Sequence, residues 1–195
     1  MSDTTVDIGP QARIVARLAH GVREEQLDLP TPCPAYAVRH LLGHVAGLAV
    51  ALRATGRKEA GDATGTDPGS TLPDLGPDWR AALPRALDDL AEAWQDPAAW
   101  QGMTRAGGLD LPGAVAGLVT ADELVVHGWD VARATGQPYV PDEAALRAAQ
   151  QLLTPAGDGD DGRDGLFGPV VPVPDEAPLL DRVIGLSGRD PYWKP

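Results

Sequence analysis

Several features that other classes of protein require are scarce or missing in this sequence. Its 195 residues include one cysteine, Cys33, so no disulfide can form within the chain, which is typical of a reducing compartment. No apolar run approaches the ~18 residues that a membrane-spanning helix needs. The first ten residues have neither the basic start nor the apolar stretch of a secretion signal. We therefore expect a cytoplasmic protein that does not enter the membrane.

Positive charge is also scarce. The chain has 16 Lys and Arg against 28 Asp and Glu, a net charge of -12 and a pI near 4.6. Phosphate backbones and anionic lipid surfaces attract basic faces, so we expect neither nucleic acid nor a membrane as a partner. Charges are interspersed and 43% of the residues are hydrophobic, which predicts one folded domain over residues 1–195. Its core is expected over residues 5–154, with a loop and a short helix in 155–195.

Apolar residues recur at helical spacing along most of the chain, whereas strand-like alternation of convincing length is missing. Helices are predicted over residues 8–27, 35–55, 78–95, 111–135, 141–153 and 176–187. For the fourth helix, Asp110 is the predicted N-cap and Gly136 the predicted end. The pattern predicts an all-α fold, a four-helix bundle with additional short C-terminal helices.

Two stretches rich in Gly, Pro and Asp are predicted to be surface loops, at residues 56–78 and 157–174. The stretch at 157–174 has a composition similar to that of a calcium-binding loop. If Asp158 held the first position of such a loop, Pro169 would hold the twelfth, where a bidentate Glu is required. The calcium interpretation therefore fails.

The fourth predicted helix carries Glu123, His127 and Asp130 at spacings of four and three residues. At about 100° per residue these side chains lie on one side of the helix. Carboxylate and imidazole are ligands of first-row metals, but two ligands do not hold zinc. On the second predicted helix, His44 lies closer to the apolar stripe than His40, so His44 is the better third ligand.

Spacing alone does not decide in favour of a metal. Glu123 and His127 could be an ordinary solvated pair one helical turn apart, and His44 a histidine at the edge of the core bonded to a carbonyl. Asp130 is expected to hold His127 by a hydrogen bond, as carboxylates do around metals, rather than to bind the ion itself. Its alternative role is to balance Arg133 on the surface.

Three stretches, taken together, are similar to the DinB-like superfamily, in particular to the branch of the mycothiol-dependent maleylpyruvate isomerases. They are PTPCPAYAVRHLLGHVAG, DELVVHGWDVARATG and DRVIGLSGRDPYW. In that family a four-helix bundle binds a divalent metal, usually zinc, through a histidine on the second helix and a Glu/His-x-x-x-His pair on a later one. The resemblance places the metal ligands at His44, Glu123 and His127.

The resemblance also implies an activity. Members of that family are thiol-dependent transferases or isomerases in which the metal activates a low-molecular-weight thiol such as mycothiol. The activated thiol then attacks an electrophilic small molecule. Those isomerases carry a larger C-terminal domain than this chain has. Two other interpretations are kept: a non-catalytic metal- or ligand-binding bundle, which could be a homodimer, and a metal-dependent hydrolase of a small amide or thioester.

The remaining conspicuous residues have simpler interpretations. Cys33 is predicted to be a small buried hydrophobe, with a reactive thiol as the alternative. The tryptophans Trp79, Trp94, Trp100 and Trp129 are expected mainly to pack. Trp129 points about 160° away from His127 on its helix, so it should not touch the metal.

Overall fold

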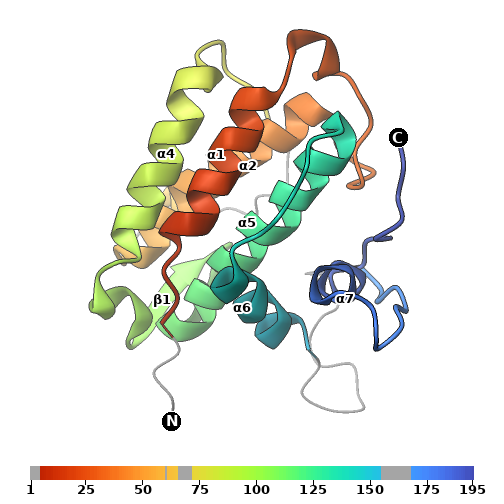
Figure 1. Ribbon diagram of the computed structural model, residues 1–195. Helices are drawn as coiled ribbons and strands as arrows, with labels where there is room; N and C mark the ends of the chain where they lie inside the picture. The colour runs from red at the N-terminus through yellow and green to blue at the C-terminus, as the bar shows by residue number, and fades with distance from the viewer. Residues whose placement is uncertain (1–4, 60, 66–71, 155–167) are drawn as a thin grey trace.

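The computed structural model describes residues 5–59, 61–65, 72–154 and 168–195 (Figure 1). Its main body is a bundle of four long helices: α1 (Gly9–Gly21), α2 (Val38–Gly56), α4 (Trp79–Ala93) and α5 (Gly113–Thr135). Both α4 and α5 pack against α1 and α2. The all-α four-helix bundle is therefore confirmed. None of the helices described is both long and apolar enough to span a membrane.

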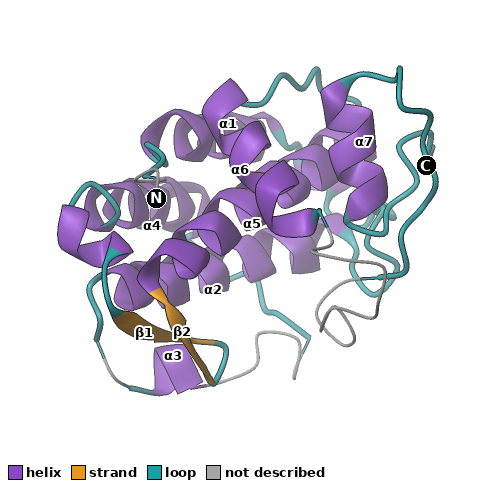
Figure 2. Ribbon diagram, turned by 90° about the horizontal axis from the view of Figure 1, so that it is seen from below, coloured by secondary structure: helices purple, strands orange, loops and turns teal. Residues whose placement is uncertain are grey.

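Shorter elements surround this bundle. They are the helices α3 (Asp62–Gly65), α6 (Glu143–Leu153) and α7 (Leu179–Leu186), and the 3-10 turns η1 (Glu24–Gln26) and η2 (Pro97–Trp100). As Figures 1 and 2 show, α6 crosses one side of α5, and α7 lies beyond α6 toward the C-terminus. The predicted C-terminal helices are thus present, with α7 shorter than expected. Most of the Gly- and Asp-rich loop lies outside the described residues.

The first two helices are shorter than predicted, for local reasons. The backbone turns extended at Val22, and the amide of Arg23 donates to the Gln26 side chain, so α1 stops well before residue 27. Ahead of α2, Pro30 and Ala37 form an antiparallel bridge and Val38 N–H donates to the carbonyl of Leu29. This bridge keeps the chain extended up to Ala37, so α2 begins only at Val38.

The structure has a β-hairpin that the sequence prediction missed. Strands β1 (Met103–Ala106) and β2 (Leu109–Pro112) pair antiparallel, and Gly107 and Gly108, both at positive φ, make the two-residue turn. Such turns need positive φ at both central positions, which glycine adopts without strain. Asp110 lies in β2 opposite Arg105, so its prediction as the N-cap of α5 is wrong, and α5 begins at Gly113. The other end is as predicted, at Gly136 in the left-handed conformation.

The N-terminal half of α5 packs closely against tryptophan. A Cβ atom built on Gly117 would lie 2.2 Å from Cζ3 of Trp100, so the ring occupies the space of a side chain. Trp100 is fixed by its Nε1–H, which donates to the carbonyl of Trp94, and the two indole rings meet edge to face. Trp79, Trp94 and Trp100 are all buried, as the packing interpretation predicted.

Candidate metal centre

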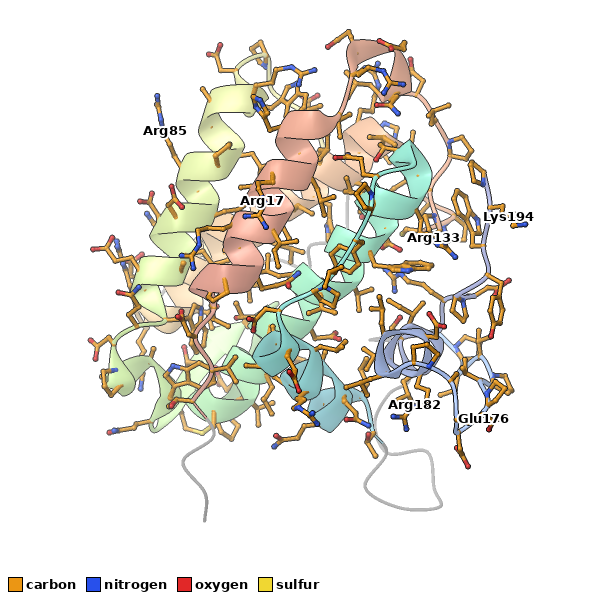
Figure 3. All side chains as sticks on the ribbon, viewed as in Figure 1. Arg17, Arg85, Arg133, Glu176, Arg182 and Lys194 are labelled. Carbon is orange, nitrogen blue, oxygen red and sulfur yellow. The ribbon has the colours of Figure 1, made fainter. Side chains whose placement is uncertain are left out.

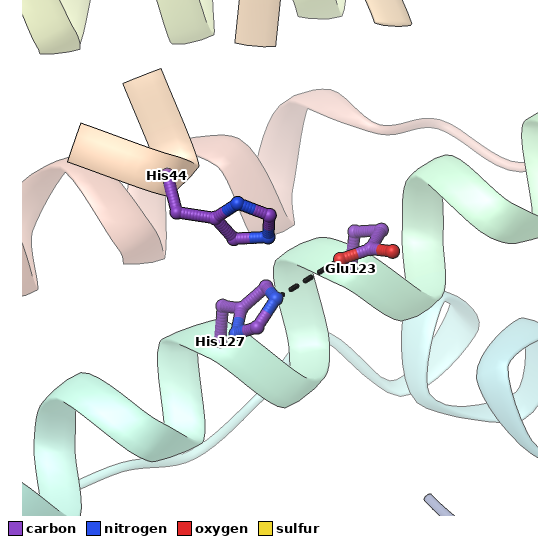
Figure 4. A group of neighbouring side chains, drawn as sticks. All are labelled: His44, Glu123 and His127. Carbon is purple, nitrogen blue, oxygen red and sulfur yellow. Dashed lines mark ion pairs between the residues drawn. The ribbon is translucent and has the colours of Figure 1, made fainter. Parts of the chain in front are cut away.

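Packing of α2 against α5 brings together the three residues predicted from the sequence. His44 projects from α2 toward α5, where Glu123 and His127 lie one turn apart (Figure 4). One ligand atom from each of the three lies within 4.8 Å of the other two. More than fifty residues of chain separate α2 from α5, yet the bundle places the side chains around one point.

His127 stands between two carboxylates. Its Nε2 lies 3.0 Å from Oε2 of Glu123, and its Nδ1 lies 3.0 Å from Oδ2 of Asp130. Burial disfavours the charged imidazolium, but the hydrogen bonds with Asp130 and Glu123 outweigh burial and raise the pKa of His127 to about 9. Without an ion, His127 therefore carries a proton on Nε2, the atom that a metal would take.

His44 is the opposite case. Its ring meets the His127 ring edge to face at 4.8 Å between centroids and lies tilted against Tyr36 at 5.3 Å. Burial, reinforced by the charge of His127, lowers the pKa of His44 to about 4. His44 is therefore neutral at pH 7, with a lone pair available to a metal.

Glu123 completes the set. Burial raises the pKa of the Glu123 carboxyl, but the hydrogen bond with His127 and the positive charge of His127 outweigh this effect, so the pKa lies below its usual value. The side chain is 27% exposed, which leaves one side of the cluster accessible to solvent. Glu123 is thus ionised at neutral pH.

This donor set fits a divalent ion. A tetrahedral zinc with bonds near 2.0 to 2.1 Å holds its ligand atoms about 3.3 Å apart, close to the 3.0 Å between His127 Nε2 and Glu123 Oε2. The set is one carboxylate and two imidazoles, a type used by catalytic zinc sites, which keep a fourth position open. A cation also suits the electrostatics, because it would replace the positive charge that the imidazolium of His127 places between the two carboxylates.

Asp130 makes the contact with His127 that was predicted for it, while its role beside a metal stays a prediction. It also has a further partner that sequence reasoning missed. The Asp130 carboxylate is fully buried, and Nε of Arg189 lies 2.9 Å from Oδ1 and 3.0 Å from Oδ2. Arg189 follows α7, 59 residues along the chain, within the GRD of the third family-like stretch. The place of that triplet in a family-like stretch was the one sequence feature that pointed to Arg189.

The surface role considered for Asp130 is therefore wrong. Its supposed partner Arg133 donates instead to the carbonyl of Pro191 and lies over the ring of Trp129. Trp129 itself packs with Val126 and Ile184 in a small apolar cluster of its own.

Two neighbouring residues have other roles. His40 is not brought to the cluster; its Nδ1 accepts from the amide of Ala37 at the start of α2. Of the two histidines in the H-x-x-x-H pattern, the structure brings only His44 to the site. Cys33 is half-buried rather than fully buried, and burial, followed by the charge of Asp130, raises the pKa of its thiol.

A family model that matches residues 8–132 identifies the class of this bundle as DinB-like and similar to maleylpyruvate isomerase. The chain belongs to the family described as the mycothiol maleylpyruvate isomerase N-terminal domain, because residues 8–132 match the model of that family. All three residues of the cluster fall within the matched range, whereas Arg189 lies beyond it.

Among its relatives are uncharacterized proteins from two strains of Mycobacterium tuberculosis. Each is 32% identical over 180 residues, which cover 89% of this chain and 91% of the relative. Among solved structures, the chain is similar to the crystal structure of the mycothiol-dependent maleylpyruvate isomerase, with 19% identity and a TM-score of 0.49. The match covers 74% of this chain and 65% of the isomerase, and a variant of that enzyme matches equally well in structure.

Proposed function

We propose that this protein binds a divalent metal, zinc in the first instance, through His44, Glu123 and His127, and uses it in a thiol-dependent transferase or isomerase reaction. The observation that carries the proposal is the convergence of these three donors, from two helices, beside an exposed edge. Membership of the family supports a thiol as the co-substrate, because the family description names mycothiol and maleylpyruvate.

The chain's own residues would act as follows. His44 is already neutral and needs to lose no proton in order to bind. His127 would release the proton on Nε2 and keep the one on Nδ1, which faces Asp130. Glu123 is ionised and balances part of the charge. When bound, the metal would lower the pKa of a thiol in the open position, so that the thiol is a thiolate at neutral pH.

A cavity supports a binding site for the organic parts of the substrates. Its volume is about 410 Å³, and it is lined by Tyr36, His40 and Trp193 among others but not by the three cluster residues. Tyr36 lines this cavity and also contacts the ring of His44. Sites for small molecules are concave, with aromatic walls and a few polar groups. We propose that the thiol or its electrophilic partner binds here.

Elemental analysis of the purified protein tests the metal site. We expect about one zinc per chain in the parent, and loss of zinc in His44→Ala, Glu123→Ala and His127→Ala. His40→Ala is the matched control, because it removes a histidine one turn away that is not part of the cluster, and it should keep its zinc. A parent that stays metal-free after zinc is supplied and the excess removed would end the proposal.

Activity assays separate the remaining interpretations. The first assay pairs mycothiol with maleylpyruvate, then mycothiol with other electrophiles, and turnover should require both thiol and metal. Turnover without any thiol would favour the hydrolase of small amides or thioesters. Zinc binding without turnover would favour the non-catalytic bundle. Assembly as a homodimer, a cytoplasmic location and a single domain over the whole chain stay predictions.

A further inference from the structure

The fully buried Asp130 is held from two sides. Its Oδ2 lies 3.0 Å from Nδ1 of His127, and the Nε of Arg189 contacts both carboxylate oxygens. The Arg189 side chain is itself only 18% exposed. A carboxylate this deeply buried needs a close cation, because an uncompensated charge in the interior is strongly destabilising. Arg189 supplies that charge from outside the helix that carries the site.

Local chain geometry explains how Arg189 reaches Asp130. Gly188, with φ +86°, follows the end of α7, and its amide donates to the carbonyl of Gly185 while the amide of Arg189 donates to that of Ile184. These two bonds form a Schellman motif, which ends a helix in a fixed direction. Ile184 in turn packs against Val126 and Trp129 on α5. The backbone of Arg189 is thereby set beside Asp130.

Another contact holds the same segment to α5 without touching Asp130. Arg133 projects from α5 toward the chain after α7, as Figure 3 shows, and donates to the carbonyl of Pro191. Trp193 packs with the cluster of Val126, Trp129 and Ile184. Docking of the segment and the contact with Asp130 therefore depend on different side chains and can be separated by mutation.

We propose that Arg189 is a positioning residue for the candidate metal centre, acting on His127 through Asp130. By contacting both oxygens of Asp130, Arg189 keeps Oδ2 directed at Nδ1 of His127. The proton on Nδ1 then stays on that side, and Nε2 is directed at Glu123 and His44. Hydrogen bonds of this kind fix the orientation of an imidazole ligand and strengthen its bond to a metal. The inference rests on the proposed function, since it assigns this orientation to metal binding.

The test measures zinc affinity by competition with a chelating indicator, in the full-length protein. We expect Arg189→Ala to bind zinc ~10- to 100-fold more weakly than the parent, the range typical of lost support around a metal ligand. Arg189→Lys should recover part of this loss, because it keeps the charge but not the planar fork. Arg133→Ala is the matched control, and it should bind within about threefold of the parent, as expected for a site it does not contact.

A double variant tests whether Arg189 acts through Asp130. If it does, Asp130→Asn with Arg189→Ala should bind zinc no more weakly than Asp130→Asn alone. The first change already removes the carboxylate through which Arg189 would act on His127, so the second has no further effect on zinc binding. Losses that add in full would overturn the proposal, as would parent-like affinity in Arg189→Ala. An equal loss in Arg133→Ala would also overturn it, by assigning the effect to docking of the segment.

A further readout needs no metal. In the metal-free parent, the proton on Nδ1 of His127 should exchange slowly with water in NMR spectra, and Arg189→Ala should speed its exchange while Arg133→Ala does not. If the parent binds no zinc, the proposed function fails, and this signal still shows whether Arg189 holds His127 through Asp130. Unchanged exchange in a folded Arg189→Ala or Arg189→Lys protein would refute the positioning role.

Discussion

The two halves of α5 differ in the interactions that they bury. From Gly113 to Ala121 the helix buries small apolar surface, with Gly117 directly beneath the ring of Trp100. From Asp122 onward it carries ionisable groups, of which Asp122, His127 and Asp130 are buried and Glu123 is partly exposed. The first half of α5 therefore depends on close packing against its neighbours. The second half depends on the charges around its ionisable side chains. We expect changes in the first half to alter stability alone, and changes in the other half to alter proton and metal binding.

The largest expected effect is the pH dependence of stability in the metal-free protein. The pKa of His127 is about 9 in the folded state and about 6.5 when unfolded, so its contribution of about 3 kcal/mol is complete below pH 6.5 and is lost as the pH rises through 9. His44 acts on the acidic side, because its pKa of about 4 means that stability falls as the pH drops from 6.5 toward 4. Urea unfolding between pH 4 and pH 9.5 should show a maximum near pH 6.5.

A variant isolates the alkaline limb of that profile. Asp130→Asn removes one of the two carboxylates that raise the pKa of His127, so the loss of stability toward pH 9 should be smaller than in the parent. If the free energy of unfolding of the parent does not change between pH 6.5 and 9.5, His127 does not have the raised pKa that its two carboxylate neighbours predict.

Metal binding should depend on pH for the same reason. A metal must displace the proton on Nε2 of His127, whereas His44 has none to lose at neutral pH. Zinc affinity should therefore fall about tenfold for each pH unit below 9, or roughly a hundredfold from pH 8.5 to pH 6.5. Calorimetry in two buffers of different ionisation enthalpy should find about one proton released per zinc at pH 7.5. Release of two protons would mean that His44 is charged or that a zinc-bound water ionises. Repeating the measurement near pH 6, where such a water keeps most of its proton, separates the two.

A smaller effect is expected from the half that depends on shape. Gly117→Ala places a methyl group against Trp100, which should lower the free energy of unfolding by about 2 kcal/mol. Gly47→Ala on α2 is the matched control, because a Cβ there meets nothing within 4 Å, and it should stabilise by about 0.5 to 1 kcal/mol. Both variants should keep the parent's zinc stoichiometry. Loss of zinc in a folded Gly117→Ala protein would show that the halves are coupled.

The bundle was predictable from the sequence because helical periodicity is a local property repeated over many turns. Stripes such as Leu41, Val45, Leu48 and Leu52 identify α2 without any knowledge of its neighbours. The hairpin was missed because strands of four residues are too short to show a pattern. Only the glycine pair Gly107 and Gly108 indicates the turn.

The candidate site was predictable in part, for a related reason. Glu123, His127 and Asp130 share one helix, so their common side follows from the spacing. The nearer position of His44 to the apolar stripe favoured it over His40, and the family resemblance agreed. Arg189 could not be found in this way, because its position depends on how α7 docks on α5. Local patterns carry no information on such a long-range contact. Whether the cluster binds a metal stays a prediction.

The contact between Arg189 and Asp130 means that the candidate site includes a residue from outside the matched family region. The matched family region ends at residue 132 and so contains every predicted ligand, yet the charge that balances the buried Asp130 enters from residue 189. In this chain, a change in the tail that removes Arg189 would leave the buried Asp130 without that cation. Relatives that share the bundle but differ in their C-terminal part should be compared by what they place there, which is a question of position in space and not of sequence alignment.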